Sequence, residues 1–123
     1  MTDKKLLKLD HYFEEQIALC NLRGKELLAD ERADEATFEK IKANIFDIFR
    51  TVFSVAVKTC NEDPDQIRCF FATRIENIPS SWETAYDKAR EHQNTVQMQI
   101  EQIKLDTVAR IRENFQRIWE ENT

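Results

Sequence analysis

Few residues of this chain have the chemistry of a metal or catalytic site, and its two histidines are the first to consider. His11 and Glu15 are four positions apart, so on a helix they would lie one turn apart and could hold a metal ion together. Di-iron sites in helical bundles also need Glu-x-x-His pairs on facing helices, and the sequence has none. Both residues would lie roughly opposite Phe13 and Ile17, and therefore in solvent. We expect no bound metal.

His92 falls at the edge of an apolar row, three residues after Ala89 and next to Gln93. A histidine in such a position could act as a proton shuttle or as a pH switch. A histidine at the boundary of a core that is hydrogen-bonded to a neighbour would give the same pattern. We favour this second interpretation.

The three cysteines are far apart in the sequence. Cys20 and Cys60 fall on apolar rows and are expected to be buried and inert, whereas Cys69 points away from its apolar row and is expected to be more exposed. A cysteine nucleophile needs a base within reach, and no spacing here supplies one. The sequence also lacks a Ser-His-Asp pattern and a nucleophile elbow. We therefore predict no catalytic residue, no cofactor and no intrachain disulfide, and a protein that is not an enzyme. An enzyme with an unrecognised pocket is a less favoured alternative.

The composition favours an all-α protein. The chain has 123 residues, enough for one domain over 1–123 with a core of its own. It contains one glycine and two prolines, whereas turns, strand bulges and phosphate-binding loops depend on such residues. Charged residues make up 33% and hydrophobic residues 41%, which is typical of an ordered, helix-rich protein rather than a disordered one.

The net charge is −5, which argues against a nucleic-acid-binding surface. No signal peptide is visible, and no apolar run approaches the length of a transmembrane helix. Three cysteines without an export signal are typical of reduced thiols. These features predict a cytoplasmic protein with no integral membrane segment.

The segment over 38–60 has the strongest apolar pattern of the chain. Two neighbouring rows of large apolar side chains recur at steps of three and four, and at about 100° per residue they span roughly 200° of a helix. An arc this wide indicates a central helix that is contacted from at least two sides. We predict that the most buried residues are Ile45, Ile48, Phe49 and Val52.

Three further helices are expected around this central one. The first covers 3–29 and has the only glycine, Gly24, on its apolar row, where we expect a bulky neighbour to approach closely. The next covers 64–77 and opens with the N-cap Asp63 and with Pro64. The last opens with a capping box of Ser80 and Glu83 and continues without a break to residue 121. The expected fold is an antiparallel helical bundle of three long helices and one short helix, with an extended C-terminal helix.

The C-terminal helix would have about forty residues and a length of about 60 Å, whereas a domain of this size is about 30 Å across. Either it bends back within one chain, or its far end, with Ile118 and Trp119, is covered by a second copy. The first helix also carries Leu7, Leu19 and Leu22 away from its apolar row. We therefore expect a homodimer through the C-terminal helix and this back face of the first helix.

The predicted function is association. We expect a non-enzymatic cytoplasmic helical-bundle protein that acts through self-association or by binding a protein partner. Because every predicted helix is amphipathic, an alternative is an amphipathic coat or adaptor on an apolar granule or membrane surface. The acidic net charge does not favour binding to anionic lipids.

Overall fold

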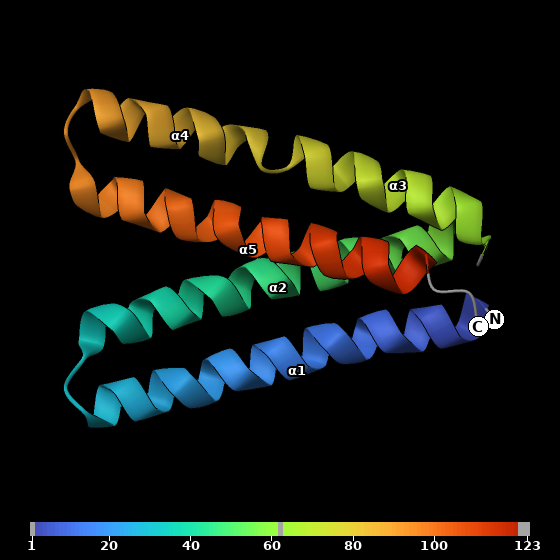
Figure 1. Ribbon diagram of the computed structural model, residues 1–123, viewed down its shortest axis with the longest axis horizontal. Coiled ribbons are helices and arrows are strands. Elements are labelled where there is room, and N and C mark those ends of the chain that lie inside the picture. The colour runs from blue at the N-terminus through green and yellow to red at the C-terminus, as the bar shows by residue number, and fades with distance from the viewer. Residues whose placement is uncertain (1, 62, 121–123) are drawn as a thin grey trace.

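The computed structural model describes the backbone of residues 2–61 and 63–120 and the side chains of residues 4–61 and 63–120. Within these ranges it contains five α-helices and no strand: α1 (Thr2–Ala29), α2 (Ala33–Thr59), α3 (Pro64–Asn77), α4 (Ser80–Glu91) and α5 (Thr95–Glu120). The predicted all-α class is confirmed. Figure 1 shows two helical hairpins, one formed by α1 and α2 and the other by α4 and α5, with α3 and α4 following each other along one edge.

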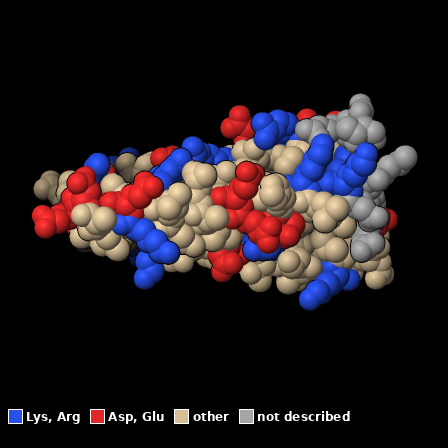
Figure 2. Space-filling model, turned by 90° about the horizontal axis from the view of Figure 1, so that it is seen from below, with Lys and Arg blue, Asp and Glu red and all other residues tan. Residues whose placement is uncertain are grey.

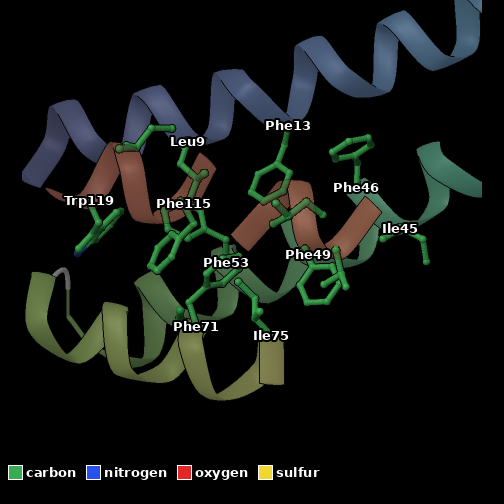
Figure 3. Close-up of a cluster of buried hydrophobic side chains, with 14 of the residues drawn as sticks. Leu9, Phe13, Ile45, Phe46, Phe49, Phe53, Phe71, Ile75, Phe115 and Trp119 are labelled. Atoms are coloured by element: carbon green, nitrogen blue, oxygen red, sulfur yellow. The ribbon is translucent and has the colours of Figure 1, made fainter. Parts of the chain in front are cut away.

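The core is aromatic and is centred on α2, which contacts α1, α3 and α5. The ring of Phe71 from α3 lies 6.3 Å from that of Phe49 and 5.7 Å from that of Phe53, both in edge-to-face geometry (Figure 3). Phe49 and Ile45 are buried as predicted, whereas Val52, which is also expected among the most buried residues, is only half-buried. The prediction for Ile48 is wrong, because its side chain remains 40% exposed. The apolar arc of α2 is thus wider than the surface that its neighbours cover.

Helices α3 and α4 are two parts of one bent helical segment. As predicted, the Asp63 carboxylate caps α3 by accepting hydrogen bonds from the backbone N–H groups of Asp65 and Gln66. The backbone stays helical through Pro79, whose carbonyl accepts the first bonds of α4. The expected capping box is wrong: the Ser80 hydroxyl lies inside the helix and donates to the Asn77 carbonyl. Pro79, which has no N–H to donate, therefore bends the chain without reversing it.

The prediction of one unbroken C-terminal helix over 80–121 is also wrong. Helix α4 ends at Glu91, and the chain reverses so that α5 packs on α4. Gln93 adopts a left-handed backbone conformation (φ 55°), and the N–H of Asn94 donates to the Ala89 carbonyl. The Asn94 side chain then caps α5 by accepting a bond from the N–H of Gln97. Of the two alternatives for this segment, the structure shows the one in which it bends back within a single chain. The predicted end at residue 121 lies outside the described residues.

The end of α5 is held by the beginnings of two other helices. Ile118 and Trp119 are 6% and 7% exposed, so this chain covers its own C-terminal apolar residues. The Trp119 indole N–H donates to the Pro64 carbonyl over 3.1 Å. The Lys5 ammonium donates to the Trp119 carbonyl and lies 5.8 Å from the centre of its ring. Ile118 and Trp119 therefore need no second copy of the chain to cover them.

Gly24 lies within α1, and its neighbours differ from the expected bulky side chain. A Cβ built at Gly24 would lie 3.9 Å from the Ala36 carbonyl oxygen and 4.0 Å from the Glu39 Cβ, which are ordinary van der Waals distances. Because alanine favours a helix interior by about 1 kcal/mol over glycine, Gly24→Ala should raise the free energy of unfolding by about that amount. Chemical denaturation followed by circular dichroism measures this change. A loss of stability would show that the packing of α1 against α2 leaves no room for a methyl group at position 24.

Candidate functional site

The two histidines lie apart from any cluster of metal ligands. His11 Nε2 is 3.7 Å from Glu15 Oε2, and both side chains are well exposed, as predicted. In the part of the chain that the structure describes, no group of three His, Cys, Asp or Glu side chains is arranged to hold a metal ion. His92 lies exposed in the turn after α4, where its backbone N–H donates to the Lys88 carbonyl. Because α4 ends at Glu91 and α5 begins at Thr95, His92 does not lie at the edge of one continuous apolar row as predicted.

The cysteines are distributed as predicted: Cys20 and Cys60 are buried, and Cys69 is exposed. Burial raises the pKa of the Cys20 thiol, and the nearby Glu39 carboxylate raises it further. A raised pKa lowers the fraction of thiolate, which is the nucleophilic form. Cys20 is therefore a structural thiol.

Cys69 lies on the wall of a cavity of about 310 Å³ between α3 and α5. Its apolar lining includes Phe115 and Trp119. Its charged lining comprises Arg68, Glu76, Arg112 and Glu120. The positive charges of the two arginines equal the negative charges of the two glutamates, so the lining has no net charge that would favour an anion or a cation. No histidine is among the lining residues, and Cys69 has no imidazole beside it of the kind that activates cysteine nucleophiles.

A buried carboxylate on α5 escaped sequence analysis. Glu101 is only 2% exposed and accepts hydrogen bonds from the Gln97 amide at 3.1 Å and from the Lys104 ammonium at 3.2 Å. Lys104 also lies 5.9 Å from the ring centre of Trp82 on α4. The available signal was the spacing of Gln97, Glu101, Lys104 and Val108 on one face. Because the carboxylate is fully partnered within the chain, we interpret this cluster as structural.

One side of the α1–α2 hairpin carries two shallow grooves, and we call this side the hairpin face. The first groove, near the start of α1, has a volume of about 300 Å³. It is lined by Leu6, Leu7, Asp10, Phe53, Ser54, Val57 and Lys58. The second groove, at the turn between the helices, has a volume of about 470 Å³. It is lined by Cys20, Asn21, Gly24, Lys25, Leu28, Ala33, Ala36, Thr37 and Lys40.

The two grooves face the same way because their residues on α1 repeat every seven positions. Leu7, Glu14, Asn21 and Leu28 form this repeat, which keeps them on one side of a helix. Between the grooves, the Arg50 guanidinium donates to Asp10 at 3.1 and 3.3 Å and to Glu14 at 3.1 Å. The hairpin face therefore has an apolar groove at each end and an ion-paired centre.

The leucines predicted to lie away from the core of α1 do so. Leu7 is 71% exposed, Leu22 57% and Leu19 39%. Figure 2, which views the molecule from the α1 side, shows acidic and basic side chains interspersed with uncharged surface. Leu28, which sequence analysis did not single out, is also 61% exposed.

No described helix is both long and apolar enough to span a membrane. Comparison with protein-family models, with curated proteins and with solved structures finds no significant match to this chain. The candidate site is therefore defined by its own geometry: exposed leucines on α1, two of which lie in the grooves of the hairpin face.

Proposed function

We propose that this protein is a non-enzymatic helical bundle that acts by association, with a homodimer as its simplest form. The observation that carries the proposal is the exposure of Leu7, Leu22 and Leu28 on α1, each more than half accessible to water. Burying a leucine side chain contributes roughly 1.5–3 kcal/mol, so a partner on this helix would gain substantially. Most soluble oligomers are homo-oligomers, and two-fold dimers are the commonest kind. The same leucines would also serve to bind a different protein. We propose that this protein acts in the cytoplasm.

The proposed role is non-enzymatic because the candidate chemistry remains dispersed. Cys20 is a buried thiol with a raised pKa, Cys69 has no adjacent imidazole, and His11 lies beside Glu15 but in no group of three possible metal ligands among the described residues. The acidic net charge supports partners other than nucleic acid.

A coat or adaptor on an apolar surface is less well supported. That alternative depends on apolar helix faces that are free to meet lipid or a granule. The largest apolar side chains of those faces, among them Phe13, Phe49 and Phe71, are fully buried inside the bundle. Coating a surface would require the bundle to open and to lose this core.

Light scattering coupled to size exclusion tests the proposal. At tens of micromolar we expect a mass of twice the 14.6 kDa of one chain. Replacing Leu7 and Leu28 with serine should shift the equilibrium toward the monomer, because serine removes the apolar surface that the partner buries. Val96→Ser is the matched control, since Val96 is 63% exposed but lies on α5. A wild-type monomer throughout the concentration range would refute self-association.

A further inference from the structure

We infer that the partner is a second copy that packs hairpin face to hairpin face about a two-fold axis, with Leu7 of each chain against the partner's Leu28. This inference rests on the proposed association and adds the surface and the register. It requires that the two ends of the face fit each other and that their charges agree.

The two ends of the hairpin face are complementary in shape. Leu7 and Leu28 are three heptads apart, which separates them by about 31 Å along α1. The groove beside Leu28 has small residues in its wall, including Gly24, Ala33 and Ala36, and these leave room for an incoming leucine. The groove beside Leu7 is lined by larger apolar side chains, among them those of the half-buried Leu6 and Val57. A two-fold axis that crosses α1 midway between Leu7 and Leu28 makes this contact twice, as a self-complementary interface requires.

Two arrangements could bring these faces together, and charge distinguishes them. With the axis across the hairpin, α1 lies antiparallel to the partner's α1. Position 10 is then opposite position 25, so that Asp10 meets the partner's Lys25, and Glu14 meets the partner's Asn21. With the axis along the hairpin, α1 lies over the partner's α2, so Lys25 comes close to the partner's Lys40. Asp10 and Glu14 then come close to the partner's Arg50. The contacts with Arg50 would only exchange ion pairs that each chain already makes, whereas the contact between the lysines adds repulsion. The first arrangement instead gives Lys25 a carboxylate across the interface and is therefore favoured.

Cysteine cross-linking tests this register. In a Cys69→Ser background, which removes the exposed native thiol, Leu7→Cys and Leu28→Cys are made singly and together. A short flexible bis-maleimide cannot join residues 7 and 28 within one chain across about 31 Å. The double variant should give a covalent dimer on a denaturing gel, and each single variant should remain monomeric. Covalent dimers from a single variant would indicate the other axis, and a ladder of larger species would indicate an open, non-closing contact. Either result would overturn the inference.

A charge reversal provides a second test that leaves the leucines in place. Lys25→Glu should raise the dimer Kd about tenfold, because it places two carboxylates opposite each other at two symmetric positions. Lys88→Glu on α4 makes the same change in net charge away from the hairpin face and should leave Kd within about twofold. A dimer that responds equally to both reversals would refute this register while leaving association intact. A wild-type monomer would refute both proposals.

Discussion

Phe49→Ala should lower the free energy of unfolding by about 3–5 kcal/mol. Phe49 is fully buried, and its ring makes edge-to-face contacts with Phe71 at 6.3 Å and with Trp82 at 6.5 Å between centroids. Truncation loses the transfer free energy of the ring and leaves a cavity between α2, α3 and α4. Because a domain of this size is stable by only about 5–15 kcal/mol, the variant should lose a large part of its stability. Chemical denaturation followed by circular dichroism measures the loss.

Ile48→Ala is the matched control for this prediction. Ile48 is adjacent to Phe49 on α2, and the apolar pattern predicts that both are buried, but Ile48 is 40% exposed. Its truncation should therefore cost about 1 kcal/mol or less. Equal losses from the two variants would contradict the packing, because they would place Ile48 in the core alongside Phe49.

The features predicted correctly from the sequence are those with a local physical cause. The start of α3 follows from Asp63 and Pro64, because a carboxylate that accepts backbone N–H groups and a residue that needs no donor belong at a helix start. The reversal after α4 has a weaker local signal. It depends on Gln93 in a left-handed conformation, which glycine normally occupies and which Glu31 and Asn61 also adopt in the two earlier turns. Residues 92–95 include neither glycine nor proline, and the predicted helix over 80–121 therefore missed this turn.

The candidate site is only partly visible in the sequence for a different reason. Exposure of Leu7 and Leu22 follows from the helical period of α1 alone. The grooves require α1 and α2 to be paired in a particular register, in which Gly24 lies near Ala36 and Asp10 meets Arg50. No local pattern specifies that pairing. Leu28 is therefore recognised as a surface residue only after the hairpin is formed.

Lys104→Met should lower the free energy of unfolding by about 2–3 kcal/mol, because it leaves the Glu101 carboxylate buried with the Gln97 amide as its remaining described side-chain partner. Methionine retains an unbranched apolar side chain, so the contact with Trp82 is partly preserved and the loss reports mainly on the charge. The expected loss is smaller than that for breaking a fully buried ion pair, about 3–5 kcal/mol, because the Lys104 side chain is 26% exposed and water reaches it.

The double variant Glu101→Leu/Lys104→Met separates the cost of an unpaired charge from the cost of altered packing. Replacing both members of a buried ion pair by apolar residues of similar volume is often neutral or stabilising, because no desolvated charge remains. The double variant should therefore recover at least half of the stability that Lys104→Met loses, as measured by chemical denaturation at neutral pH. If it is no more stable than the single variant, the loss comes from packing around Trp82. If Lys104→Met alone costs less than about 0.5 kcal/mol, Glu101 reaches solvent and the burial assigned to it is wrong.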